Sequence, residues 1–158
     1  MTDLTMHARD AIHGAQGRAY VTIEGNRYLF AQLINLEARV DKTKTQVPIM
    51  GRTGKGNKAT GWEGTGSATF HYNTSIFREL LYRYQETGED VYFDIQVTNE
   101  DANSSVGRQT TILKDCNMDG GIVALLDADA EYLEDTVDFT FERIELPERF
   151  NILNTMQS

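Results

Sequence analysis

The chain has few of the residues that would support a disulfide-bonded, membrane-spanning or secreted protein. Its 158 residues include one cysteine, Cys116, which excludes an internal disulfide framework and fits a reducing compartment or an assembly that does not rely on disulfides. No apolar run approaches the ~20 residues of a membrane span. The first residues, Met1–His7, contain neither a basic nor an apolar signal region, so we expect no secretory signal and no membrane insertion.

Positive charge is also scarce. The formal net charge is −9, which argues against a protein that grips nucleic-acid phosphates, because such binding relies on Lys and Arg. The charge is unevenly distributed: residues 42–58 contain five bases and no acid, and residues 127–142 contain seven acids and no base. Two solvated loops would explain this pattern. The alternative is a pair of complementary surfaces that meet between neighbouring copies, where charge sets register and partner choice.

The glycine-rich and acidic segments do not complete a known binding motif. Gly51 and Gly56 have the first spacing of a phosphate-binding loop, but Asn57 follows where that loop requires Lys. The acidic residues from Asp127 onward lack a calcium loop's Gly at the sixth position and Glu at the twelfth, where Tyr132 and Asp138 stand. We therefore predict neither a phosphate site nor a calcium site.

Catalytic and metal-binding patterns are missing as well. The three histidines, His7, His13 and His71, do not have the i, i+4 spacing of a zinc-binding helix. Cys116 has no His nearby in the sequence, and Ser104-Ser105 lies outside any nucleophile-elbow pattern. The sequence thus gives no positive signal for catalytic residues, a cofactor or a metal site.

The segments that are present alternate mainly with a period of two, which predicts a mainly-β domain spanning residues 1–158. The alternation is typical of half-buried strands. One amphipathic helix is expected over 74–87, with Thr74 or Ser75 as N-cap and Gly88 at its C-terminal end. The fold class is a β-sandwich or barrel with one packed helix. The expected strands cover 18–23, 27–31, 34–41, 65–72, 91–97, 108–115, 121–126 and 136–142.

Two segments are expected to be irregular. Residues 42–64 are predicted to form a long loop, and loops beyond roughly 12–15 residues are usually functional or disordered. This segment contains Val47, Ile49, Met50 and Trp62, which a merely solvated loop would not need. The C-terminal tail 147–158 opens with a proline and ends in a polar run.

The stretch from Glu37 to Glu148 resembles the XkdM-type tail tube proteins of PBSX-like defective prophages and related contractile bacteriocins. The strongest match is the segment from Glu37 to Arg52, which contains the Lys-x-Lys and Ile-Met-Gly-Arg patterns. Further matching segments are Thr60-Gly61-x-x-Gly64-Thr65-Gly66-x-Ala68-Thr69-Phe70, Gly107-Arg108 with Leu125-Leu126-Asp127, Glu134-Asp135-x-Val137-x-Phe139-Thr140-Phe141-Glu142, and Leu146-Pro147-Glu148.

The resemblance implies a non-enzymatic structural subunit without cofactors. Members of this family form six-membered rings whose sheets join edge to edge, and the rings stack into a tube inside a contractile sheath. The implied partners are further copies of the chain, a sheath protein, baseplate or initiator proteins and a tail terminator, and DNA can pass through the lumen without specific binding. The implied location is a virion tail or bacteriocin particle, assembled in the bacterial cytoplasm.

Three sets of residues are candidates for contacts in such a tube. The predicted ring-stacking interface is Lys42, Lys44, Val47, Ile49, Met50, Arg52, Lys55, Lys58 and Trp62, and the predicted acidic counter-surface is Asp127, Asp129, Glu131, Glu134 and Asp135. The predicted lumen residues are Glu37, Arg39, Ser67, Thr69, Asp138, Thr140 and Glu142, with Asp94 and Gln96 in reserve, because a polyanion slides past a like-charged or neutral wall.

Other classes of protein stay open at this point. A monomeric β-rich binding module could use the basic 42–64 segment to hold an acidic partner, and a hydrolytic enzyme is a third alternative. The sequence also leaves open whether a tube would belong to a DNA-delivering phage, a defective prophage or a headless bacteriocin.

Overall fold

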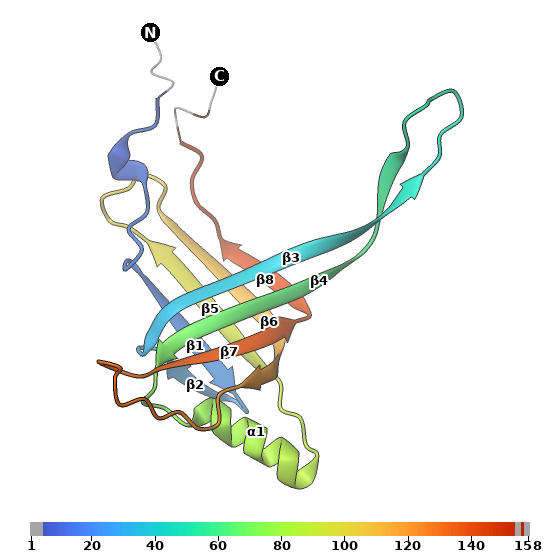
Figure 1. Cartoon of the computed structure of the whole chain (residues 1–158). Coiled ribbons are helices and arrows are strands. Elements are labelled where there is room, and N and C mark those ends of the chain that lie inside the picture. The colour runs from blue at the N-terminus through green and yellow to red at the C-terminus, as the bar shows by residue number, and fades with distance from the viewer. Residues whose placement is uncertain (1–4, 154–155, 157–158) are drawn as a thin grey trace. The chain divides into compact units, whose positions relative to one another are not determined.

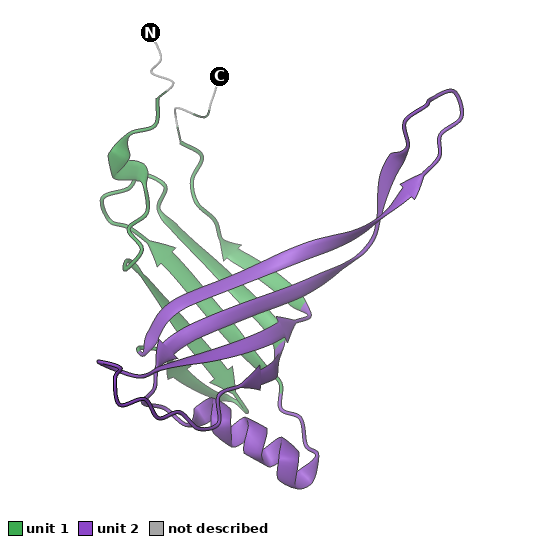
Figure 2. Ribbon diagram, in the orientation of Figure 1, with its two compact units in different colours: residues 1–31, 92–115, 143–158 green, residues 32–91, 116–142 purple. Residues whose placement is uncertain are grey.

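The computed structural model describes residues 5–153 and 156, and these residues form two compact units (Figures 1 and 2). Of the described residues, the first contains 5–31, 92–115, 143–153 and 156, and the second contains 32–91 and 116–142. The elements are η1 (Ala8–Asp10), β1 (Gly17–Ile23), β2 (Asn26–Leu29), β3 (Leu33–Val47), β4 (Gly56–His71), α1 (Ile76–Thr87), β5 (Phe93–Glu100), β6 (Arg108–Gly121), β7 (Glu134–Phe141) and β8 (Arg143–Glu148). The predicted mainly-β fold with one helix is confirmed.

The first unit is an antiparallel sheet built from β2, β1, β5, the first half of β6 and β8. β1 pairs with β2 through a tight turn in which Glu24 and Gly25 both have positive φ. β1 also pairs with β5, and β8 pairs with β6. One face of this sheet carries the buried side chains of Val21, Ile95 and Leu113, and the alternate residues of β1 and β5 are polar.

The second unit contains the sheet formed by the end of β6, β7, β4 and β3, together with α1. Its core contains four aromatic side chains, Phe70, Phe77, Phe139 and Phe141. Gly66 lies opposite Phe139 across β4 and β7, and a Cβ atom on Gly66 would lie 2.5 Å from Cζ of that ring. The phenyl rings therefore lie directly over the β4 backbone, which only glycine permits at this distance.

Helix α1 begins at Ile76 and packs on this sheet. Phe77 and Leu80 are buried, and the ring centroids of Phe77 and Phe70 are 5.5 Å apart. Gly88 ends the helix with φ +72°, and its N–H donates to the carbonyl of Tyr84. The predicted helix and its C-terminal glycine are confirmed. In the part of the chain that the structure describes, no helix is long and apolar enough to cross a membrane.

Three segments differ from the sequence-based predictions. The predicted 42–64 loop is mostly strand, because β3 and β4 stay paired from Asp41↔Glu63 to Val47↔Gly56. Residues 121–126 do not form the predicted strand, since the β6–β7 ladder ends at Gly121↔Val137. The extra strand β8 was not predicted. It pairs only with β6, so Pro147 lies in a strand with an open edge, where its missing N–H costs little.

Candidate assembly surfaces

The most unusual feature of the second unit is a two-stranded arm, residues 41–63, that extends beyond its sheet (Figure 1). β4 pairs with β7 only from Gly64 onward, so the arm strands pair only with each other. The eight residues from Gly56 to Glu63 give the arm a length of roughly 25 Å, at about 3.3 Å per residue. Apart from Gly56, every arm residue is exposed. An isolated two-stranded ribbon is marginally stable in water, and the arm gains no stability from burial within its own chain.

The tip of the arm presents an apolar side chain in a tight turn. A turn spans Ile49 to Arg52, in which the N–H of Arg52 donates to the carbonyl of Ile49 at 3.2 Å. Its third residue, Gly51, has φ +85°, a conformation that glycine adopts without strain. Met50 is the second residue of the turn, and it is fully exposed. Folding of the single chain therefore leaves this side chain in water.

All nine predicted stacking residues lie on this arm and are exposed. Trp62 lies opposite Lys42 near the base and is 49% exposed, whereas Val47 and Ile49 approach the tip. Ile49 packs against the arm backbone, because a Cβ atom on Gly56 would lie 3.1 Å from Ile49 Cδ1. The arm thus combines exposed apolar groups with five basic residues. Their role in ring stacking stays a prediction.

The predicted lumen residues of β3, β4 and β7 share one face of the second unit's sheet. Glu37, Ser67 and Asp138 are direct cross-strand neighbours, and Thr140 lies opposite Thr65 in the adjacent row. We name this surface the polar face. Its alternate residues outside the arm are Asn35, Glu37 and Arg39 of β3, Thr65, Ser67 and Thr69 of β4, and Glu134, Thr136, Asp138 and Thr140 of β7. These residues include three acids and one base, so the face has a net negative charge.

Three predicted lumen residues lie elsewhere. Glu142 follows the end of β7. The reserve residues Asp94 and Gln96 belong to β5 of the first unit, where Asp94 accepts hydrogen bonds from Lys114 Nζ at 3.3 Å and from the backbone N–H of Asp115 at 3.1 Å. These two residues are therefore part of a different sheet region from the polar face.

Four members of the predicted acidic counter-surface are exposed, and one is not. Asp127, Asp129 and Glu131 lie in the connection from β6 to β7, and Glu134 begins β7. Asp135 is buried, with 3% of its surface exposed, so it cannot belong to a docking surface. Alternation explains this correction: position 135 points toward the core side, as Val137 and Phe139 do.

Asp135 instead joins the helix to the sheet. Its Oδ2 atom accepts a hydrogen bond from Arg78 Nη1 at 2.6 Å, and the Arg78 guanidinium also lies 4.3 Å from the ring centroid of Tyr72. A second donor atom of Arg78 bonds the carbonyl of Thr74, just before α1. A buried acid needs such a partner, because an unpaired charge is strongly disfavoured away from water.

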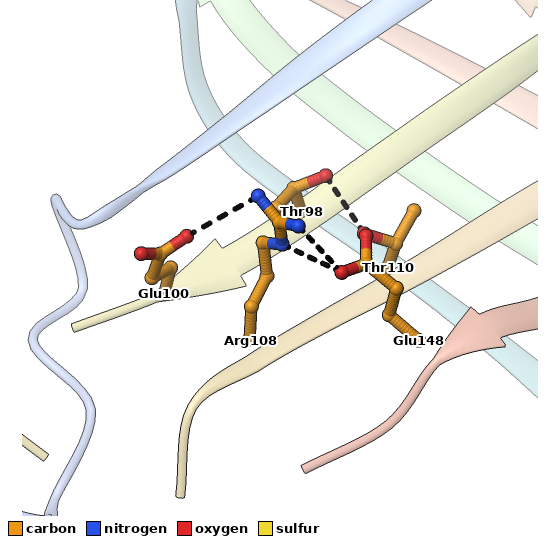
Figure 3. Close-up of polar contacts among 5 residues, drawn as sticks. All are labelled: Thr98, Glu100, Arg108, Thr110 and Glu148. Carbon is orange, nitrogen blue, oxygen red and sulfur yellow. Dashed lines mark hydrogen bonds and ion pairs between the residues drawn. The ribbon is translucent and has the colours of Figure 1, made fainter. Parts of the chain in front are cut away.

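The first unit contains a polar network on the outer face of its sheet (Figure 3). Arg108 donates to Glu148 through Nε at 2.8 Å and Nη2 at 2.6 Å, and lies 3.8 Å from Glu100. Thr110 links Glu148 to Thr98, with distances of 3.0 Å and 3.2 Å. The hydrogen bond from Arg108 and, to a smaller extent, that from Thr110 lower the pKa of Glu148. The hydrogen bond to Glu148 in turn raises the pKa of Arg108. The network fixes the last strand, β8, onto β6.

The loop between β5 and β6 holds the segment that precedes β1. The Asp10 carboxylate accepts hydrogen bonds from the N–H and Oγ of Ser105, and these bonds lower its pKa. Asp101 accepts from the N–H groups of Asn103 and His13, which likewise lower the pKa of Asp101. Both carboxylates therefore serve as structural acceptors within the first unit.

Each unit also contains a cleft that the sequence did not predict. The first unit has a polar cleft of about 420 Å³ above the network of Figure 3, with Arg18, Arg27 and Arg108 among its lining residues. The second unit has a groove of about 320 Å³ beside α1, which we name the α1 groove. It is lined by Leu80, Leu81, Tyr84, Asp90, Val91, Asn117, Met118 and Asp119. Among residues 5–153 and 156, no three His, Cys, Asp or Glu side chains gather as metal ligands would.

Comparison with known proteins gives consistent results. A family model described as phage tail tube protein matches residues 4–148. The chain is 39% identical over 148 residues to the phage-like element PBSX protein XkdM of Bacillus subtilis strain 168, covering 94% of this chain and 98% of that protein. It is 40% identical over 146 residues to protein YqbM of the same strain, covering 92% of this chain and 97% of YqbM.

The fold is also similar to that of solved tube assemblies. A chain of the anti-feeding prophage baseplate has a TM-score of 0.65 at 12% identity, covering 86% of this chain and 95% of that one. The SPP1 tail tube has a TM-score of 0.61 at 10% identity, with 90% and 81% covered. At these identities the likeness shows the fold alone. The family match covers most of the chain, and the chain therefore belongs to the phage tail tube protein family, as a structural subunit of a phage-type tail tube.

Proposed function

We propose that the chain assembles into six-membered rings, which stack into a hollow tube inside a contractile sheath. The observation that supports this proposal is the arm. Its apolar and basic side chains are exposed to water, because the rest of the second unit does not cover them. In a stacked tube, the arm binds the adjoining ring. The basic residues along its strands, Lys42, Lys44 and Lys58, then face the exposed acids Asp127, Asp129, Glu131 and Glu134 of a neighbouring copy.

Strand edges support the closure of rings. β2 and β3 are the two ends of the strand order, so each has one edge that pairs with no other strand among the described residues. A 15-residue edge strand such as β3 is a liability in a monomer, since it offers a row of free backbone donors and acceptors. Pairing with identical neighbours around a closed ring removes these edges.

We place the polar face on the bore of the tube. Its strands carry Glu37, Ser67 and Asp138 in one row, and no lysine belongs to this face. A wall of this charge does not retain a polyanion by counterion release. DNA can therefore move through such a bore without specific binding.

The remaining partners follow from this assembly. A tube of this kind requires a sheath protein around it, a baseplate or initiator below it and a terminator above it. The subunits are proposed to assemble in the bacterial cytoplasm and to catalyse no reaction, since the described clefts contain no nucleophile–base arrangement among their lining residues.

Imaging of concentrated protein tests the proposal. We expect negative-stain micrographs to show rings or tubes with six-fold symmetry, either spontaneously or in the presence of tail baseplates. A compact 17.8 kDa species at every concentration, with and without baseplates, would contradict it and favour a monomeric binding module.

Cysteine labelling tests which face lines the bore. The native Cys116 is fully buried, so Ser67→Cys adds a single accessible thiol on the polar face, and Glu79→Cys adds one on the exposed side of α1 as a control. In long tubes, a bulky polymer-linked maleimide should react with Glu79→Cys and not with Ser67→Cys, although both react when unassembled. Equal labelling of Ser67→Cys in tubes and free subunits would show that this face is not the bore.

A further inference from the structure

The second unit has complementary surfaces at its two ends. Figure 2 shows the arm at one end of this unit and α1 at the opposite end. The arm tip, residues 48–55, presents Ile49 and Met50. The α1 groove combines apolar side chains, including Leu81 and Met118, with two acids.

The groove has the chemistry that the arm tip requires. Its apolar lining includes Val91 and Tyr84, and Tyr84 is 56% exposed in the single chain. A methionine thioether packs well against aromatic rings and adapts to irregular gaps. The tip can thus bury Met50, the most exposed apolar side chain of the arm, in a cavity of about 320 Å³.

Charge favours the same pairing. The groove has Asp90 and Asp119 among its lining residues, and the tip carries Arg52 and Lys55. Asp90 accepts a hydrogen bond from Asn117 at 2.7 Å and still has free acceptor capacity, because a carboxylate offers about four lone-pair sites. Opposite charges around an apolar centre are typical of a specific protein interface, since they fix its register.

We propose that the arm tip of one subunit inserts Ile49 and Met50 into the α1 groove of a second copy in the adjoining ring. This inference rests on the stacking role of the arm and adds the receiving site to it. Arg52 and Lys55 bind Asp119 and Asp90 at the rim of the groove.

The positions of these surfaces explain continued growth. Because the tip and the groove lie at opposite ends of one unit, each subunit that fills a groove still offers its own groove. Such a heterologous, head-to-tail contact does not close between two copies and propagates along an axis. An elongating tube requires this property.

Cross-linking in tubes tests the pairing directly. In the variant Met50→Cys/Leu81→Cys, a short bismaleimide should join neighbouring subunits and give a ladder of covalent oligomers on a denaturing gel. Cys116 is buried and adds no background. The matched control, Met50→Cys/Arg9→Cys, places the second thiol on an exposed position outside the arm, the α1 groove and the acidic counter-surface, and should give no ladder.

The outcomes separate this inference from the proposed function. If tubes form but the ladder appears in the control alone, or in neither variant, the arm tip does not insert into the α1 groove. Such a result would still be compatible with a role of the arm in stacking. Failure of the unmodified chain to form tubes even with baseplates would instead overturn the proposed function.

A charge exchange gives a second readout if the cysteine pair itself stops elongation. Arg52→Asp and Asp119→Arg should each slow elongation about tenfold, because like charges then meet at the rim. The double variant should recover to within about threefold of the unmodified chain, since the pair is restored with its signs exchanged. Single effects that simply multiply, to about a hundredfold, would show that the two residues do not meet.

Discussion

The same two strands behave differently on either side of Gly64. From Gly64 to His71, β4 lies between β3 and β7, and its inward residues pack under phenyl rings. From Gly56 to Glu63, it pairs only with β3, and almost every side chain is in water. β3 and β4 pair through both parts, with an irregularity in the arm between Thr43 and Lys44, so pairing of these two strands alone does not separate arm from sheet. The difference is the buried surface: it stabilises the rest of the chain, which we call the body, and within one chain the arm lacks it.

The largest expected effect comes from the apolar residues of the arm. Replacing Ile49 and Met50 with Ser should abolish tube elongation while leaving the thermal unfolding midpoint of the free subunit unchanged within error. In the proposed assembly these side chains contribute to a contact between subunits, and they lie outside the core. Electron microscopy and calorimetry measure the two properties. A large fall in the midpoint would show that the arm belongs to the body of the fold.

In the body, loss of the buried ion pair should be costly. Arg78→Ala leaves the buried Asp135 carboxylate without its partner, so we expect the free energy of unfolding to fall by about 3 kcal/mol. Urea denaturation of the free subunit measures this change. The exposed pair Arg39–Asp41 provides the comparison, and Arg39→Ala should cost less than about 1 kcal/mol.

Two glycines of β4 provide a matched test on either side of the boundary. Gly66→Ala should reduce stability by about 2 kcal/mol, because the new methyl group would collide with the Phe139 ring. Gly61→Ala, on the arm, meets no atom within 4 Å and should change stability by less than about 0.5 kcal/mol. Equal effects in urea denaturation would remove the distinction between arm and body.

Acid should weaken the body through Glu148. Its pKa is lowered in the folded chain, so the stability it contributes is present above its ordinary pKa of 4.5 and is lost as pH falls through the lowered value. The thermal unfolding temperature of the unmodified chain should therefore decrease as the pH is lowered below about 4.5. The decrease should be less steep in Glu148→Gln. Glu86→Gln, on exposed α1 surface, should keep the original profile. Parallel profiles for all three chains would contradict this role of β8.

The smallest effect concerns the basic residues along the arm. Lys42→Glu/Lys44→Glu should slow assembly most at low ionic strength, because salt screens exposed charges beyond about 10 Å at 0.1 M. Light scattering during assembly at several salt concentrations measures the rate. Arg9→Glu, exposed but outside the arm, should have little effect at any salt concentration. A deficit that does not depend on salt would favour a packing role for these side chains.

The sequence predicted the mainly-β class, one helix and most strands, because alternation and capping are local signals. It misjudged the arm, since Lys42–Val47 and Gly56–Glu63 have no buried face and therefore no apolar alternation to detect. It also placed Asp135 on a surface, although the alternation through Val137 and Phe139 pointed that carboxylate inward. The α1 groove joins residues from α1, the segment after it and β6, so no local pattern could have revealed it.

Removal of the arm tests the central claim most directly. Val40 and Gly64 are cross-strand partners, so an Asn-Gly turn can join these residues in place of 41–63. The shortened chain should fold with an unfolding midpoint close to that of the full chain, yet form no tubes in electron micrographs, even with baseplates present. Tubes of normal length and yield from the shortened chain would show that the arm has no role in assembly.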